Sequence, residues 1–298
     1  MSHSHSHSHS HSQGDKTSTS KLVVAVLINI ILTIVQVVAG VFSGSLSLLA
    51  DALHNLSDAG AIVVAIVARV IGNKPANKKM PYGYKRAEMI GVLVNSTTLV
   101  VVGIYLIVES FDKYFNPTPV NGWIVFVVAA FALIIDLATA YITYTSGAKE
   151  NMNIKAAFIH NVSDALASVV VIVAGVLIVL YDMYIVDVIA TLLISIYVIY
   201  HGVLLLVDSI RIIMQATPKN IDIDDVIKTI SEQSNVDLVK SVRVWQLNEN
   251  ENYLDAKVVI SNLEFDLVVY EIKQALHFKY GIENSVIEVT NKVERDIL

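Results

Sequence analysis

Long runs of apolar residues dominate the first two thirds of the chain. Six of them reach the roughly 20 residues that a helix needs to cross a bilayer. They cover residues 22–42, 46–71, 87–108, 123–144, 154–181 and 185–207. Only isolated polar residues interrupt these runs. The pattern therefore predicts an α-helical membrane protein with a six-helix transmembrane bundle.

The hydrophobic period changes after this region. Apolar positions recur with helical spacing in residues 222–231 and 267–278, whereas residues 238–247, 253–260 and 285–289 alternate or are β-branched, as strands are. The order α-β-β-α-β predicts a small α+β domain of the metallochaperone-like kind. We expect three parts: a disordered, His-rich cytoplasmic tail (1–20), the six-span membrane domain (21–215) and a cytoplasmic α+β dimerisation domain (216–298).

Basic residues are distributed unevenly among the connecting loops. Lys and Arg gather in the loops after the second and fourth runs and in the segment after the sixth, and the other loops contain few of them. The positive-inside rule then places both termini in the cytoplasm. The first run is too long for a signal-peptide core and has no clear cleavage site, so we expect it to be retained. The expected location is the plasma (inner) membrane of a bacterium.

Composition narrows the possible partners. Charged residues make up 16% of the chain, against about 25% in an ordinary soluble domain. The absence of cysteine excludes disulfides and thiolate metal ligands. Residues 216–298 contain nine Lys or Arg and fifteen Asp or Glu. This negative charge argues against nucleic acid or anionic lipid as a partner of the α+β domain, whose plainest alternative role is a stabilising or dimerising cap without chemistry.

Two nearly identical hexapeptides lie inside the predicted spans. HNLSDA begins at His54, and HNVSDA begins at His160. In each copy the histidine and the aspartate, Asp58 or Asp164, are four residues apart and share one face of a helix. Ionisable side chains in a span are costly and usually mark a pathway or a site. His54 is eight residues into its run, about 12 Å along a helix, well inside the membrane.

The two copies lie on spans that run in opposite directions. Such a pair indicates an inverted repeat, which transporters use to build a site near the bilayer midplane. Two imidazoles and two carboxylates around one point form a tetrahedral set that suits zinc. We therefore expect His54, Asp58, His160 and Asp164 to bind one divalent cation, which is the transported ion and not a resident cofactor.

Ligand chemistry suggests how the ion leaves. Histidine must be neutral and aspartate ionised to bind a metal, so protonation expels the metal. The predicted activity is therefore cation/proton exchange by alternating access, with potassium or no counter-ion as alternatives. A metalloenzyme needs an open coordination position and a general base, and a four-ligand cage provides neither, so no enzymatic activity is expected. A metal-gated channel or sensor is the remaining alternative.

Three stretches give the chain a specific resemblance. GSLSLLADALHNLSDAG, YGYKRAEMIG and the second HxxxD pair resemble the cation diffusion facilitator family, as does the order of six spans and an α+β domain. The resemblance implies a homodimer that exports divalent metal from the cytoplasm, often by proton antiport. The two His-Asp pairs are similar to the zinc-transporting branch. Cadmium, cobalt, nickel, manganese and iron remain alternative substrates.

The chain departs from this family in two places. The loop GNKPANKKMP, residues 72–81, has no His, Asp or Glu, so we expect no metal site there. Family members often bind zinc in the cytoplasmic domain through histidines where this chain has Arg243, Lys257 and Asn284, and only His277 remains nearby. We expect a metal-poor or metal-free cytoplasmic domain in which the two cations fill the space.

Other polar residues have two possible roles each. Asp51 is either a proton carrier or partner of His54, or a helix–helix hydrogen-bonding residue; Asp136 is either a proton-relay or a packing residue. Gln36 is expected to bond between helices, and His201 to be a packing residue. The Ser-His repeat is either a native tail that captures metal weakly or an expression tag. Its histidines are His3, His5, His7, His9 and His11.

Overall fold

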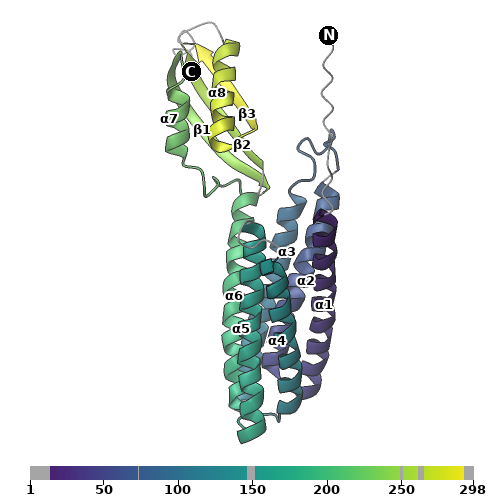
Figure 1. Ribbon diagram of the computed structural model, residues 1–298. Helices are drawn as coiled ribbons and strands as arrows, with labels where there is room; N and C mark the ends of the chain where they lie inside the picture. The colour runs from purple at the N-terminus through teal and green to yellow at the C-terminus, as the bar shows by residue number, and fades with distance from the viewer. Residues whose placement is uncertain (1–13, 73, 146–151, 249–250, 261–264, 292–298) are drawn as a thin grey trace, which may run out of the picture. The chain divides into compact units, whose positions relative to one another are not determined.

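A computed structural model describes residues 14–72, 74–145, 152–248, 251–260 and 265–291. Long helices lie at all six predicted positions in this part of the chain (Figure 1). They are α1 (Gly14–Ser43), α2 (Leu46–Gly72), α3 (Ala87–Phe115), α4 (Gly122–Thr145), α5 (Met152–Tyr181) and α6 (Ile185–Ile213). Residues 1–13, which contain the histidine-rich repeat, lie outside the described ranges, and α1 begins at Gly14, within the segment 1–20 that was assigned to the tail.

Four helices are long and apolar enough, over their described residues, to cross a membrane. These are α3, α4, α6 and the Phe158–Tyr181 part of α5, while the described apolar part of α1, Leu27–Ser43, is shorter. Large apolar side chains such as Phe42, Phe131 and Leu193 are exposed on these helices. An exposed apolar surface of this extent is unfavourable in water and fits a lipid environment.

Two helices end later than the hydrophobic pattern predicts. Helix α3 continues from the expected end at Val108 to Phe115, and α6 continues from Val207 to Ile213. The apolar run marks only the part of a helix that lipid covers, whereas the backbone hydrogen bonds continue into polar sequence. Lys113 and Arg211 lie in the last turns, where a cation interacts favourably with the helix dipole.

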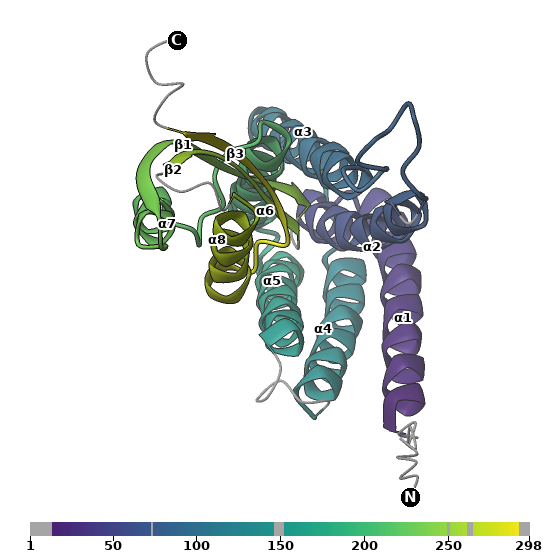
Figure 2. The ribbon, with the colours of Figure 1, turned by 90° about the horizontal axis from the view of Figure 1, so that it is seen from above.

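The chain divides into two compact units. The first contains Met1–Gly60 and Thr98–His201, and the second contains Ala61–Thr97 and Gly202–Leu298. In the first unit α4 and α5 lie side by side, and α1 contacts α4 (Figures 1 and 2). Gly122 and Gly175 allow the close approach of α4 and α5, because a Cβ on Gly175 would lie 2.8 Å from the Phe126 backbone nitrogen.

The C-terminal elements confirm the predicted α-β-β-α-β order. They are α7 (Ile223–Ser231), β1 (Val236–Asn248), β2 (Glu251–Ile260), α8 (Phe265–Tyr280) and β3 (Asn284–Asn291). Strand β2 is central, antiparallel to β1 and parallel to β3. Helices α7 and α8 cover one face of this sheet (Figure 1). Val226, Ile230, Leu254, Ile272 and Leu276 form the core between the two layers.

The close contact of α4 with α5 makes a stability prediction. Gly175→Ala places a methyl group against the backbone of Phe126, which cannot rotate away, so the helices must separate. We expect destabilisation of about 1–3 kcal/mol, the usual cost of overpacking, measured as a lower thermal unfolding midpoint in detergent. Gly72→Ala is the matched control, because its nearest atoms are 3.8 and 3.9 Å away. Equal midpoints for both variants would contradict the predicted contact.

Candidate metal centre

Helices α2 and α5 bring the two hexapeptides together within the first unit. The Nε2 atom of His54 lies 3.3 Å from Oδ1 of Asp164, and Nε2 of His160 lies 3.6 Å from Oδ2 of the same carboxylate. The two imidazole centroids are 6.0 Å apart. Asp164 thus lies between histidines contributed by segments 106 residues apart in the sequence.

These separations can be compared with those around a metal. Bonds of 2.0–2.2 Å to a tetrahedral zinc ion place neighbouring ligand atoms about 3.3–3.6 Å apart. The distances from Asp164 to the two histidines fall in this interval. Among the side chains that the structure describes, no three His, Cys, Asp or Glu form a complete metal-holding group. Asp58 lies one turn after His54 on α2, and its side chain is outside the described residues.

Burial differs among the three described members of the quartet. His54 and Asp164 are buried, with 5% and 4% of their surfaces exposed. The side chain of His160 is 44% exposed. One histidine and the carboxylate are therefore shielded, while the second histidine is accessible from outside the protein interior.

A tyrosine on α6 also contacts this group, and sequence reasoning missed it. The ring of Tyr197 lies edge-on to His54 with centroids 5.9 Å apart, and His201 lies 4.6 Å from Tyr197. His201 also contacts Tyr200, in agreement with its expected packing role. The four-residue spacing of Tyr197 and His201 on one helix face was the signal that could have drawn attention to both.

Asp51 belongs to a buried hydrogen-bond chain between α1 and α2. Gln36 Nε2 donates to Asp51 Oδ2 over 2.7 Å, and Asn55 Nδ2 donates to Gln36 Oε1 over 3.1 Å. The expected interhelical role of Gln36 is confirmed. In the described part of the chain the other oxygen of Asp51 is buried without a hydrogen-bond partner. These hydrogen bonds fix the position of Asn55, the residue that follows His54.

A corresponding arrangement joins α4 and α5. Ser168 Oγ donates to Asp136 Oδ2 over 2.9 Å, and Asn161 Nδ2 donates to Thr143 Oγ1 over 3.2 Å. Asn161 follows His160, as Asn55 follows His54. In both copies, therefore, the asparagine of the hexapeptide forms a hydrogen bond to the preceding helix. Asp136 has the expected packing contact, and its possible role as a proton relay stays a prediction.

In the C-terminal sheet, ion pairs occupy the positions at which the family resemblance implies metal ligands. Arg243 Nη1 lies 3.5 Å from Asp255 Oδ2, and Lys257 Nζ lies 2.7 Å from Glu288 Oε2. Both pairs join neighbouring strands. Cations at these positions repel a divalent metal and leave the nearby carboxylates already paired.

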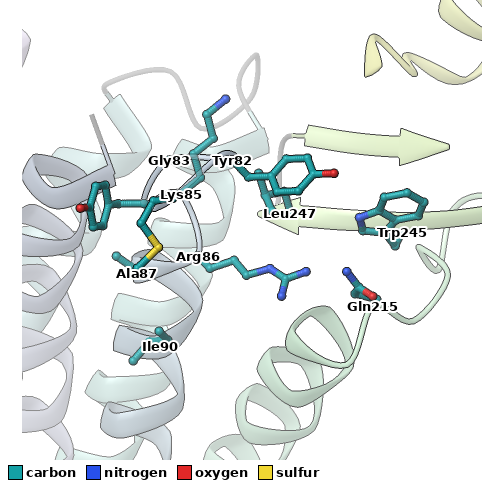
Figure 3. Close-up of a pocket in the computed structure, with 11 residues that line it drawn as sticks. Tyr82, Gly83, Lys85, Arg86, Ala87, Ile90, Gln215, Trp245 and Leu247 are labelled. Carbon is teal, nitrogen blue, oxygen red and sulfur yellow. The ribbon is translucent and has the colours of Figure 1, made fainter. Parts of the chain in front are cut away.

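A cavity of about 410 Å³ lies in the second unit (Figure 3). Its walls come from the segment preceding α3 and the first turn of that helix, from Gln215 and from β1. Figure 3 shows the Arg86 guanidinium pointing toward Gln215. Lys85 forms a bidentate pair with Glu251, with both distances 2.6 Å, and this carboxylate raises the pKa of Lys85. The lining residues include two cations and no Asp, Glu or His. Such a cavity does not favour a divalent cation.

A helical bundle with His-Asp pairs on facing helices and a C-terminal α+β domain is the architecture of a metal-transport protein. The model for the cation efflux transmembrane domain matches residues 22–214, and that for the cation efflux protein cytoplasmic domain matches residues 218–291. The chain belongs to the cation efflux, or cation diffusion facilitator, family. It is therefore an integral membrane protein of a transporter family.

Several bacterial transporters are similar to this chain over most of its length. The cadmium, cobalt and zinc/H(+)-K(+) antiporter of Bacillus subtilis is 31% identical over 86% of this chain and 84% of its own. The metal cation efflux system protein CzcD of Cupriavidus metallidurans is 32% identical, with 86% and 81% covered. The zinc transporter ZitB of Escherichia coli is 29% identical, with 86% and 82% covered.

The ion pairs of the C-terminal sheet make a prediction about metal content. We expect the protein without residues 2–13 to bind one zinc ion per protomer, measured by equilibrium dialysis and elemental analysis, because the charges of Arg243 and Lys257 disfavour a second site in the C-terminal sheet. The chain with its tail is the control and should retain additional, weakly bound zinc. Two or more tightly bound ions in the tail-less protein would contradict a metal-free cytoplasmic domain.

Proposed function

We propose that this protein exports divalent metal ions, zinc foremost, from the cytoplasm in exchange for protons. The transport site consists of His54, Asp58, His160 and Asp164, and alternating access exposes it to each side of the membrane in turn. The observation that carries the proposal is the position of Asp164 between His54 and His160, at separations compatible with a shared tetrahedral zinc ion.

The ligand types couple the metal to protons. Zinc requires neutral imidazole and ionised carboxylate, so the metal and protons compete for the same atoms. The partial exposure of His160 supports a site that ions enter and leave. The names of the relatives, which include zinc, cadmium and cobalt with H(+) exchange, support the same chemistry.

The basic loops favour both termini in the cytoplasm, and relatives from bacteria favour the plasma membrane as the location. The match to a cytoplasmic domain of efflux proteins supports a homodimer joined through residues 218–291. A cage in which the protein provides all four ligands leaves no position for a catalytic water, so the proposed activity is transport without catalysis.

Uptake into inside-out membrane vesicles tests the metal and the counter-ion together. We expect saturable zinc uptake that a proton gradient accelerates. His54→Asp should change the ratio of manganese to zinc uptake by at least about tenfold in favour of manganese, because carboxylate ligands suit harder ions. His277→Ala is the matched control, since this histidine lies on α8 outside the quartet. Non-saturating flux that ignores the pH gradient would favour a metal-gated channel instead.

Direct zinc binding tests the quartet itself. Simultaneous replacement of His54, Asp58, His160 and Asp164 by alanine should remove the single high-affinity site from the tail-less protein, as measured by isothermal titration calorimetry. The same protein with His201→Ala serves as a control for loss of a membrane histidine. Unchanged affinity and stoichiometry in the quadruple variant would show that the metal binds elsewhere.

A further inference from the structure

A second buried charge cluster lies at the beginning of α2, away from the proposed ligands. Asp187, in the first turn of α6, is fully buried. Its Oδ1 accepts hydrogen bonds from Ser45 Oγ and Ser47 Oγ, each over 2.6 Å. The Leu46 nitrogen donates to Asp187 Oδ2 over 3.0 Å, and the Ser47 nitrogen donates to Oδ1 over 3.2 Å. One carboxylate therefore receives four hydrogen bonds, three from the first turn of α2 and one from Ser45, the residue before it.

Lys113, in the last turn of α3, completes this group. Its Nζ lies 2.9 Å from Asp187 Oδ2 and also donates to the carbonyl oxygen of Gly44. Only 8% of Lys113 is exposed. We call Gly44, Ser45, Ser47, Lys113 and Asp187 the α2 anchor. It joins the turn between α1 and α2 to the end of α3 and to the beginning of α6.

The chemistry of a helix beginning explains the bonds in the α2 anchor. The first backbone N–H groups of a helix have no partner within the helix and carry a partial positive charge. A carboxylate satisfies both requirements, and Ser45 adds a local cap by accepting from the Leu48 nitrogen over 3.1 Å. Asp187 comes from 140 or more residues further along the chain. It therefore fixes α2 against another helix, which a local serine cap cannot do.

The position of the α2 anchor matters because α2 carries half of the proposed metal site. His54 lies nine residues after Ser45, about 13 Å along the helix axis. A tilt of α2 by about 10° at its beginning would therefore move His54 by about 2 Å, as far as a whole zinc–nitrogen bond. A loosely held first turn would leave His54 and Asp58 without a fixed position opposite His160 and Asp164.

We propose that Asp187 and Lys113 are positioning residues of the transport site. They hold the first turn of α2 against α3 and α6, and thereby place His54 and Asp58 for metal binding. This role rests on the proposed function of the quartet. A buried ion pair is often no more stabilising than apolar residues of the same size, so the α2 anchor contributes geometry that packing alone would not specify.

The test removes both charges together, since either charge left alone in this buried position would threaten folding. We expect Lys113→Met with Asp187→Asn to give a folded protein by size-exclusion chromatography, with an unfolding midpoint close to that of the wild type. Its KM for zinc uptake and its Kd for zinc should each rise about tenfold or more. The exposed pair Lys228→Met with Glu232→Gln is the matched control and should change neither.

A charge-exchanged variant separates positioning from simple ion pairing. Lys113→Asp with Asp187→Lys restores opposite charges, but an ammonium group cannot accept hydrogen bonds from the Leu46 and Ser47 nitrogens. We therefore expect no rescue of KM or Kd. Wild-type affinity in the neutral double variant, or full rescue by the exchange, would overturn the positioning role. Failure of the wild-type vesicles to transport zinc would instead count against the proposed function.

Discussion

A carboxylate or imidazole buried within a membrane bundle requires a partner, and this requirement organises the helices of the first unit. Placing an aspartate at the centre of a span costs about 3 kcal/mol even by permissive measures. Each buried aspartate described there has a partner on a different helix: Asp51 with Gln36, Asp136 with Ser168, Asp164 with His54, and Asp187 with Lys113. These contacts determine which helices are neighbours and how each is rotated, which lipid-facing apolar residues cannot do.

The partners also repeat between the two halves of the bundle. Asn55 bonds α2 to α1, and Asn161 bonds α5 to α4. The repetition is incomplete, because Asp51 lies three residues before His54 whereas Ala157 occupies the equivalent position before His160. The halves therefore supply similar ligands in unequal surroundings, with His54 shielded and His160 partly exposed. Of the two proposed histidine ligands, His54 is therefore the one that the bundle encloses.

The features that could be predicted from the sequence are those that patterns of neighbouring residues encode. Hydrophobic runs gave the six helices, alternation gave the three strands, and a repeated hexapeptide gave the candidate ligands. The helix ends at Phe115 and Ile213 were missed because hydropathy stops at the lipid boundary while the helix does not. Tyr197 and the α2 anchor were missed because their contacts join separate helices. The Ser45–Asp187 hydrogen bond spans 142 residues, and no short-range pattern predicts which span begins beside which.

The kind of partner distinguishes the aspartates that join helices from Asp164, which belongs to the proposed metal site. Gln36 and Ser168 do not titrate, and the Lys113 ammonium group is an intrinsic cation that cannot ligate a metal. Asp164 is different, because its partners are two histidines, and a neutral imidazole offers a lone pair to a metal. In the proposed exchanger, protons and metal compete for the atoms of the Asp164 group and not for the hydrogen bonds that position α1, α2 and α6. Such a separation is what an exchanger requires, since the scaffold must survive each protonation that releases the cargo.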